Sequence, residues 1–392
     1  MSKILPTIGP VSEKHSDIKK ILQFSKLVRL NGSHNTLEWH KNISNYIKYL
    51  NSKNKILLDI PGIKPRTCNT KNIRIKKKEK IIFYFKEKPN KDFQSIKLTN
   101  PLPKIDKKCK FFSISDGQYF FRLLFYNKNY IVGKSENEFI LESMKGLNIP
   151  YSEYSNKLQE KVYKKFLKKF KSIKFDAIGL SFIQNEKILI SIKKVYPDIV
   201  LVAKIENYKG LVNIKNICNH CDAIMIDRGD LSAEIGENNL FSAVMDISKI
   251  TKSYGKPLIM ATENIDSMIT RSSPTKSEIV SLGLSLMLKA DRIMLSEETA
   301  TAKNWYKILK WLNDFIRINE DNVQRKKINA KKNTDIIWNI VSQVSNLPII
   351  IFTRKGFAVE KILSLNEENQ LIVFTDNIKT YTICEFRSNI KT

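Results

Sequence analysis

The chain has 392 residues, of which 42% are hydrophobic, and this composition is typical of a globular protein with two or three domains. It carries 67 basic residues against 39 acidic ones, so its formal net charge is +28. The lysines are spread along the chain together with an excess of Asn and Ile, and the sequence lacks a basic motif interleaved with aromatic residues. We therefore expect no nucleic-acid partner, and nucleic-acid binding is kept as an alternative that rests on composition only.

Five cysteines lie at irregular spacing, which is typical of free thiols in a reducing compartment. Cys218 and Cys221 form a C-x-x-C motif, but a second ligand pair does not follow it, so we interpret them as packed residues at a helix end. The sequence lacks a run of about 18 apolar residues, and its start lacks an apolar segment of signal-peptide length. These features predict a cytoplasmic protein without a membrane partner.

Apolar strands and amphipathic helices alternate from the start of the chain, and the third strand runs into a loop broken by Pro and Gly. The strands are predicted at 3–9, 27–34 and 55–67, and the helices at 11–25 and 36–51. From 63 to 156 the pattern changes to short β-rich pieces separated by Lys, Asn, Pro and Gly. This change indicates a small β domain inserted into the alternation.

The alternation resumes at about residue 157. Helices are predicted at 157–172, 185–196, 208–219, 240–254, 275–289 and 303–319, and strands at 176–182, 199–206, 222–227, 257–262 and 291–296. Eight strands, each followed by a helix once the insert is set aside, predict an α/β protein with a closed (β/α)8 TIM barrel made of 1–62 and 157–323. An open doubly wound sheet is the alternative.

The tail, 324–392, begins with a basic linker and then reads as a small α/β module. It is predicted to hold a helix, a strand at 347–352, a helix at 356–365, a strand at 371–374 and a last helical piece. A module of about 60 residues is short for an independent open sheet. We therefore expect it to lean on the barrel or on a neighbouring subunit.

Two neighbouring strands of the predicted barrel end in charged residues. Lys204 and Glu206 close one strand and share a face, because successive strand residues alternate faces, and Asp230 follows the next strand. A lysine beside two carboxylates makes a divalent-metal site with an adjacent cation, which suits substrates that carry phosphate and carboxylate groups. A surface salt-bridge cluster is the alternative for these residues taken alone.

Polar residues stand at the ends of most of the predicted strands, and active sites of such barrels lie at the carboxyl ends of the strands. These residues are Arg29, Asn31, Ser33, His34, Asp59, Lys64, Arg66, Lys204, Glu206, Gly229, Asp230, Thr262, Ser296, Glu297 and Glu298. Taken singly, each also fits a salt bridge, a turn or a helix cap. Together they describe a phosphoryl-transfer pocket, with cations on the phosphate, carboxylates on Mg²⁺ and backbone amides for a carboxylate.

Eight segments resemble pyruvate kinase, in the order in which that family has them. They are TIGP (7–10), VRLNGSH (28–34), LLDIPGIKPRT (57–67), MKGLNIP (144–150), AKIEN (203–207), RGDL (228–231), PLIMAT (257–262) and MLSEETA (294–300). The resemblance covers essentially the whole chain. It implies a barrel with a β domain (63–156) inserted after the third strand and a shortened C-terminal α/β domain (324–392). It also implies a homo-oligomer, tetramer or dimer, that transfers phosphate from phosphoenolpyruvate to ADP, giving pyruvate and ATP.

The same resemblance assigns roles to residues at the barrel mouth. It implies that Lys204 stabilises charge on the transferring phosphoryl group and that Arg29 holds this phosphate. Glu206 and Asp230 would ligate Mg²⁺ or Mn²⁺. The substrate's carboxylate end would contact Gly229, Asp230 and Thr262, and enolate protonation would pass through Thr262. A monovalent-cation site would comprise Asn31, Ser33, Asp59 and the Ile60 carbonyl, and nucleotide contacts would come from Pro10, Asn31, His34, Arg66 and Lys145, the last offered by the inserted domain as it closes like a lid.

Several residues depart from the family's pattern. Lys64 stands where potassium-dependent members have glutamate, and its ammonium could replace the K⁺ charge, so we expect activity without K⁺. Five other changes are expected around the pocket, at Gln184, Asp227, Glu263, Lys276 and Glu297. The family's C-terminal domain continues past the point that matches Thr392, so we do not expect the sugar-phosphate effector response. A degenerate homologue with a binding or assembly role is the alternative to a working enzyme.

Overall fold

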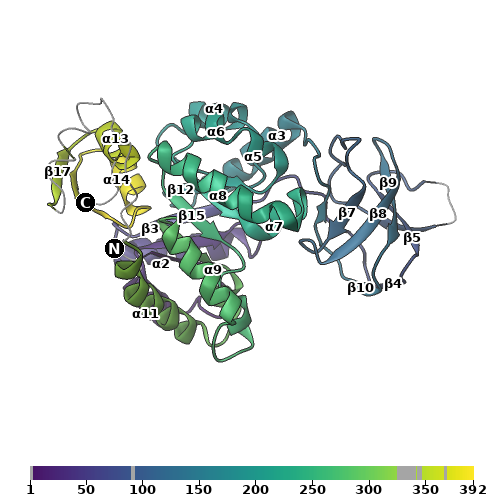
Figure 1. Cartoon of the computed structure of the whole chain (residues 1–392), viewed down its shortest axis with the longest axis horizontal. Helices are drawn as coiled ribbons and strands as arrows, with labels where there is room; N and C mark the ends of the chain where they lie inside the picture. Colours follow the sequence, from purple (N-terminus) through teal and green to yellow (C-terminus); the bar gives the residue numbers. More distant parts are fainter. Residues whose placement is uncertain (1–2, 90–92, 325–340, 342–346, 366–368) are drawn as a thin grey trace.

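A computed structural model of the chain describes residues 3–89, 93–324, 341, 347–365 and 369–392. Its centre is an eight-stranded parallel sheet surrounded by helices, with a small β domain at one end and a small α/β unit at the other (Figure 1). Within the described ranges, every helix is too short or too polar to cross a bilayer.

The eight strands follow chain order around a closed barrel. They are β1 (Ile4–Pro6), β2 (Leu27–Asn31), β3 (Lys55–Ile60), β12 (Ala177–Leu180), β13 (Val200–Ile205), β14 (Ala223–Asp227), β15 (Leu258–Ala261) and β16 (Arg292–Leu295). The first and second strands close the ring, because the Ile8 N–H donates to the Arg29 carbonyl at 3.0 Å and Thr7 bridges Arg29 in parallel. The closed barrel is therefore confirmed, and the open doubly wound sheet is excluded.

The strands read as continuous apolar runs because both of their faces are covered. One set of strand residues fills the barrel interior, and among them are Leu5, Leu57, Val202, Met225 and Ile259. The alternate residues pack outward against the helices in two further clusters. Most polar side chains of the strands therefore lie at or near the strand ends, where the predicted site lies, although Arg29 stands in the middle of β2.

The surrounding helices match the predicted alternation with some additions. They are α1 (His15–Phe24), α2 (Leu37–Leu50), α3 (Asn156–Lys169), α4 (Glu186–Val195), α5 (Tyr208–Val212), α6 (Ile214–His220), α7 (Arg228–Ile235), α8 (Glu237–Ser253), α9 (Lys276–Met287), α10 (Glu297–Ala300) and α11 (Trp305–Gln324), with a 3₁₀ turn η1 (Asp266–Ile269). The single helix predicted at 208–219 is two helices that meet at Asn213. Helix α7 was not predicted, because six of its eight residues are buried and it lacks an amphipathic pattern.

The inserted domain is a small β structure between β3 and α3. Its strands are β4 (Ile73–Ile75), β5 (Lys80–Tyr84), β6 (Gln94–Lys97), β7 (Phe111–Ile114), β8 (Tyr119–Tyr126), β9 (Tyr130–Ser135), β10 (Phe139–Leu141) and β11 (Leu147–Asn148). Six of them form a sheet in the order β11-β7-β8-β9-β5-β6, and β10 pairs with β4. The rings of Phe83, Phe112 and Phe121 pack together in its core at centroid distances of 5.1–5.6 Å.

The C-terminal unit is a three-stranded parallel sheet with two helices. It comprises β17 (Ile349–Phe352), α13 (Phe357–Leu365), β18 (Leu371–Phe374), α14 (Ile378–Glu385) and β19 (Ile390–Lys391), and the helix predicted before 347 lies outside the described residues. This unit leans on the barrel. The Arg387 guanidinium donates to the Gly255 carbonyl, and Lys256 pairs with Glu360 at 2.9 Å. Phe386 joins the cluster of the barrel interior.

Gly255→Ala is expected to destabilise the docking of the C-terminal unit by about 2 kcal/mol, because its backbone is left-handed and an added methyl has no room. Gly255 has a φ of 60°, and a Cβ there would lie 2.1 Å from the Glu360 carbonyl oxygen. Thermal unfolding should therefore begin at a lower temperature. Gly283→Ala in α9 is the matched control, because its Cβ would have no neighbour within 4 Å among the described residues. Equal melting curves for the two variants would contradict the prediction.

Candidate active site

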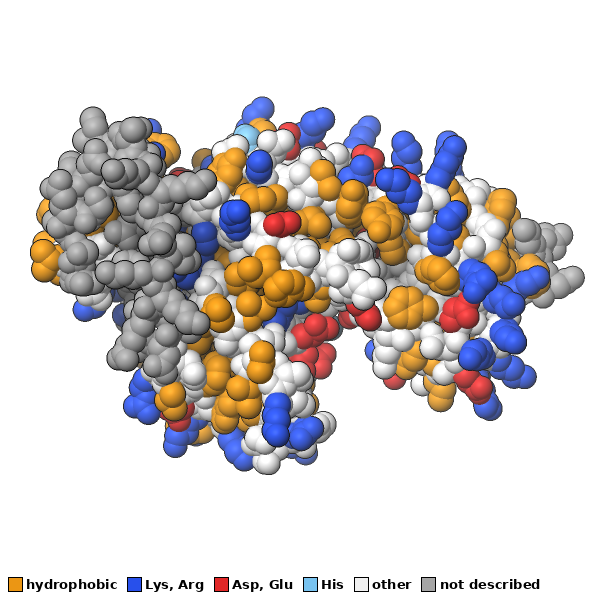
Figure 2. Space-filling model, in the orientation of Figure 1, with side chains coloured by type: hydrophobic (Ala, Val, Ile, Leu, Met, Phe, Trp, Pro, Cys, Tyr) orange, Lys and Arg blue, Asp and Glu red, His pale blue; other side chains and the backbone are white. Residues whose placement is uncertain are grey.

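A cavity of about 410 Å³ opens at the carboxyl ends of the barrel strands. Nine carboxylate residues line it, against four basic ones: Arg29, Lys64, Arg66 and Lys204. Figure 2 shows acidic side chains gathered at the notch between the barrel and the inserted domain. The mouth is therefore acidic although the chain is strongly basic, and such a mouth favours metal cations.

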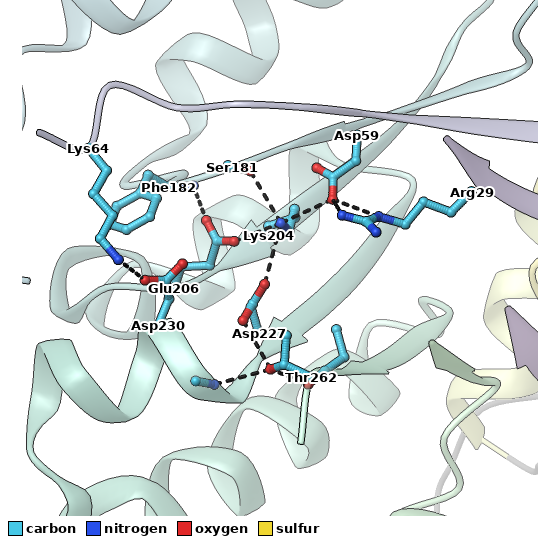
Figure 3. A network of polar contacts seen from close by, with 12 residues as sticks. Arg29, Asp59, Lys64, Ser181, Phe182, Lys204, Glu206, Asp227, Asp230 and Thr262 are labelled. Carbon is cyan, nitrogen blue, oxygen red and sulfur yellow. Dashed lines mark hydrogen bonds and ion pairs between the residues drawn. The ribbon is translucent and has the colours of Figure 1, made fainter. Parts of the chain in front are cut away.

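Lys204 lies at the centre of this cavity, near the end of β13 (Figure 3). Its buried Nζ is 2.8 Å from Glu206, 3.2 Å from Asp59 and 3.4 Å from Asp227. It also donates to the Ser181 hydroxyl at 3.2 Å. Burial alone would lower the pKa of Lys204, but the three carboxylates hold it well above the usual value. The barrel therefore keeps a permanent, fixed cation at its mouth.

Arg29 and Asp59 form a buried ion pair beside Lys204. The Arg29 Nε and Nη2 donate to Asp59 Oδ2 at 2.9 and 2.8 Å, and Nη1 donates to the Thr7 hydroxyl at 2.9 Å. Burial raises the pKa of Asp59, but Lys204 and Arg29 outweigh it and lower that pKa overall. Asp59 Oδ2 thus joins the two cations that sequence analysis assigns to the phosphate. Asp59 Oδ1 is buried and has no hydrogen-bond partner among the described residues.

Three carboxylates meet on the other side of Lys204. Glu206 follows β13, Asp227 ends β14, and Asp230 lies in the first turn of α7, and one oxygen of each lies within 4.8 Å of the others. Burial, helped by the two neighbouring acids, outweighs the opposing effect of Lys204 and raises the pKa of Glu206 to about 8. Such crowding is relieved by a hard divalent cation, for which carboxylate oxygens are the preferred ligands. The donor set therefore fits Mg²⁺ or Mn²⁺.

Asp230 also connects the barrel to the inserted domain. Lys64 pairs with Asp230 and, at 3.0 Å, with Asp116 in the turn between β7 and β8. The Asn148 side chain of β11 donates to Asp230 at 3.1 Å. Lys64 runs so close to Gly146 that a Cβ there would lie 2.5 Å from its Cε. Burial alone would lower the pKa of Lys64, but the Asp230 and Asp116 carboxylates raise it overall.

This position of Lys64 differs from the place expected for it. Its ammonium is expected to replace the charge of K⁺ at the site that includes Asp59, but its partners are Asp116 and Asp230, on the side of Lys204 where the three carboxylates meet (Figure 3). The residues that sequence analysis assigns to that site remain near the mouth. Asn31 and Ser33 line the cavity, where Asn31 Oδ1 accepts the Ser33 N–H at 3.1 Å.

Thr262 is held in an unusual backbone conformation after β15. Its φ is 57°, which costs energy for a β-branched residue and is found mainly at functional sites. Arg228, a residue that sequence analysis did not single out, donates from Nε to the Thr262 carbonyl at 3.1 Å and from Nη2 to the Glu263 carbonyl at 2.9 Å. The Thr262 hydroxyl donates to Asp227 at 3.0 Å and accepts the Gly229 N–H at 3.1 Å. Arg228 therefore positions the hydroxyl beside the three carboxylates.

Only some of the residues assigned to nucleotide binding line the cavity. Asn31 and Arg66 line it, and Arg66 donates to the Met144 carbonyl at 3.1 Å. Pro10, His34 and Lys145 lie outside the described lining, and Lys145 pairs with Glu142 at 2.8 Å.

Two of the departures expected around the pocket lie away from it. Gln184 is buried and exchanges hydrogen bonds with the Tyr154 backbone at 2.8 and 3.0 Å, and Lys276 is exposed at the start of α9. Asp227, Glu263 and Glu297 do line the cavity. The lining also includes residues that were not predicted: Asp116, Ser181 and Phe182, which lie outside the helices and strands, and Asp266, which begins η1. A buried neighbour of Asp266 is Glu298, whose pKa rises to about 8 through burial and then through that aspartate.

The closed barrel, the inserted β domain and the lysine set among carboxylates together indicate the family to which the chain belongs. A family model described as "Pyruvate kinase, barrel domain" matches residues 1–307. The chain belongs to the pyruvate kinase family. It is 32% identical to a pyruvate kinase of Thermococcus litoralis over 77% of this chain and 66% of that relative, just under two thirds of its length. It is 25% identical to one from Thermotoga maritima and 27% identical to one from Methanocaldococcus jannaschii, each over 97% of this chain and 85% of the relative.

Proposed function

We propose that this protein is a working pyruvate kinase, which transfers the phosphoryl group of phosphoenolpyruvate to ADP and releases pyruvate and ATP. The observation that carries the proposal is the buried Lys204 ammonium at the mouth of a barrel of the pyruvate kinase family. Asp59, Glu206 and Asp227 hold this ammonium between them. A barrel that served only as a scaffold would gain little from a buried lysine with three carboxylate partners, since burying charge is costly.

The proposed ligands of the divalent metal are Glu206 and Asp230, with Asp227 beside them. A bound Mg²⁺ or Mn²⁺ would neutralise phosphate and carboxylate charge of the substrate. Asp230 already receives hydrogen bonds from Lys64 and Asn148, which fix the orientation of this carboxylate. The inserted domain therefore supports the metal ligand through Asn148 and through the contact of Lys64 with Asp116.

The chain's own residues would divide the remaining work. Lys204 and Arg29 would bind the phosphoryl group and stabilise its charge, because both are fixed cations that need no reorganisation. The Gly229 N–H would receive the substrate carboxylate once it leaves the Thr262 hydroxyl, to which it donates at 3.1 Å. That hydroxyl would then be available to pass a proton towards the enolate. Asn31 and Arg66 are the nucleotide contacts with the best support, since both line the cavity.

Activity is expected to be independent of K⁺. Lys64 brings a positive charge to the mouth, bound to Asp116 and Asp230, and Arg29 and Lys204 already neutralise the buried Asp59. A further monovalent cation is therefore not needed to balance these carboxylates. The measurement is the rate of pyruvate formation in K⁺ buffer and in tetramethylammonium buffer at equal ionic strength. A strong K⁺ requirement would contradict this expectation.

Pyruvate formation by the purified protein tests the proposed function. The assay supplies Mg²⁺, ADP and phosphoenolpyruvate, and it measures pyruvate with lactate dehydrogenase and ATP by luminescence. We expect equal amounts of pyruvate and ATP, and loss of both when EDTA removes the metal. Activity no higher than that of a Lys204→Met variant would favour the alternative, a degenerate homologue with a binding or assembly role.

A further inference from the structure

The outer face of the inserted sheet carries a row of cations that crosses three neighbouring strands. In the register of the sheet, Lys80 on β5 is opposite Lys134 on β9, and Lys134 is opposite Arg122 on β8. Phe111 on β7 extends the row opposite Arg122. Residues directly opposite each other share a face and lie about 5 Å apart, and like charges in such pairs destabilise a sheet. Glu136 is the acidic neighbour that offsets part of this charge, at 3.1 Å from Arg122.

Exposed phenylalanine rings lie among these cations. Phe93, Phe111, Phe120 and Phe125 are 38–47% exposed and make up four of the eight exposed phenylalanines among the described residues. The Lys80 Nζ lies 5.5 Å from the centre of the Phe93 ring, and the Arg122 guanidinium lies 5.8 Å from that of Phe111. Apolar rings grouped on one face of a small domain are a mark of a binding surface.

The other two rings, Phe120 and Phe125, lie on the same face of the sheet, because side chains alternate between the two faces along each strand. Phe120 is two residues from Arg122, so both point to the same side of β8. A register shift in β8 then places Phe125 opposite Val132, which is two residues from Lys134 on β9. We call Lys80, Arg122 and Lys134, with these four phenylalanines, the basic aromatic face. Figure 2 shows basic and hydrophobic side chains side by side over the inserted domain.

We propose that the basic aromatic face binds single-stranded nucleic acid. Its cations would contact the phosphates and its rings would stack on unpaired bases, which is how small β domains bind single strands. Charge complementarity supports a polyanion, because residues 63–156 hold 20 basic residues against 9 acidic ones. A duplex hides its bases from the rings. A membrane is disfavoured, since cations and rings share one rigid sheet face, whereas membrane-surface helices separate them on two faces.

The linear sequence conceals this face. Its three cations are 42 and 12 residues apart along the chain and belong to three different strands, so a search for a basic motif finds none. Only the antiparallel register brings them into one row. This site lies on the inserted domain's sheet and is separate from the cations of the barrel mouth, so it does not depend on the proposed reaction.

Binding of labelled single strands by the full chain tests the proposal. The probes are fluorescein-labelled 20-mers of oligo(U) RNA and oligo(dT) DNA, followed by fluorescence anisotropy from 50 to 200 mM KCl. We expect binding of one or both probes that weakens with salt. The triple variant Lys80→Gln, Arg122→Gln, Lys134→Gln should bind at least about ten-fold more weakly, and its log–log salt slope should be smaller by about 2.

The matched control removes the same charge elsewhere. Lys161, Lys165 and Lys168 are exposed on α3, so their triple glutamine variant has the same net charge as the first. It should bind within about two-fold of the parent chain if position rather than total charge decides the affinity. Phe120→Ala should weaken binding of the 20-mers but not of an abasic strand, because only bases stack. Equal losses in the two triple variants, or binding of anionic vesicles without binding of either 20-mer, would overturn the proposal.

Discussion

Lys204→Met is expected to lower kcat for pyruvate formation by about three orders of magnitude, because one preorganised charge at a transition state contributes on that scale. Lys204 pairs with two carboxylates of the cluster, Glu206 and Asp227, and Asp59 also fixes its ammonium. Methionine keeps the length and the apolar stem of the side chain but removes the charge. The KM for phosphoenolpyruvate should change much less than kcat, since Arg29 still binds the phosphate in the ground state.

The controls for this variant separate lost charge from lost folding. Lys187→Met removes an exposed lysine on α4 and should leave the rate unchanged. Removing one partner of a buried charge cluster can cost about 3–5 kcal/mol of stability, so thermal unfolding of Lys204→Met must be compared with that of the parent. Lys204→Arg keeps the charge in another shape and should retain more activity than the methionine variant. A folded methionine variant with near-parental kcat would contradict the role given to Lys204.

The barrel could be predicted from the sequence because its strands have one local signature. Segments such as KILLDI in β3 and VLVAKI in β13 are mostly apolar, and an amphipathic helix follows each strand once the inserted domain is set aside. A closed barrel is the simplest arrangement of eight such units. The barrel then predicts that four site residues lie close together, because the carboxyl ends of the strands meet at one mouth. These residues are Arg29, Asp59, Lys204 and Glu206.

Contacts across loops and between strands could not be predicted in the same way. The long Lys64 side chain could reach several carboxylates from its loop, and its partners depend on where the inserted domain places Asp116 and Asn148. Helix α7 is buried on most sides, so its sequence lacks the periodicity that reveals surface helices. The row of Lys80, Lys134 and Arg122 requires the antiparallel register, which the hydrophobic pattern alone does not specify.

Asp227→Ala is expected to weaken the binding of Mn²⁺ to the substrate-free protein by at least about ten-fold, because metal affinity follows the number of charged oxygen ligands. The Asp227 carboxylate lies in the cluster with Glu206 and Asp230, although the resemblance to the family assigns the metal to the latter two. Its removal lowers the charge facing the ion by one and frees Lys204 from one of its three carboxylate partners. Free Mn²⁺ can be followed by electron paramagnetic resonance during titration of the protein, without any substrate.

Two further variants show what kind of contact Asp227 makes. Asp227→Asn keeps an oxygen that can accept the hydrogen bond of the Thr262 hydroxyl but loses the charge, so it should weaken Mn²⁺ binding nearly as much as alanine does. Glu263→Gln removes a carboxylate that lines the cavity outside the cluster and should leave Mn²⁺ affinity unchanged. Unchanged affinity in both Asp227 variants would restrict this residue to positioning Lys204 and Thr262. A loss of affinity in the two Asp227 variants, but not in Glu263→Gln, would make Asp227 a third carboxylate on the metal, at a position that departs from the family's pattern.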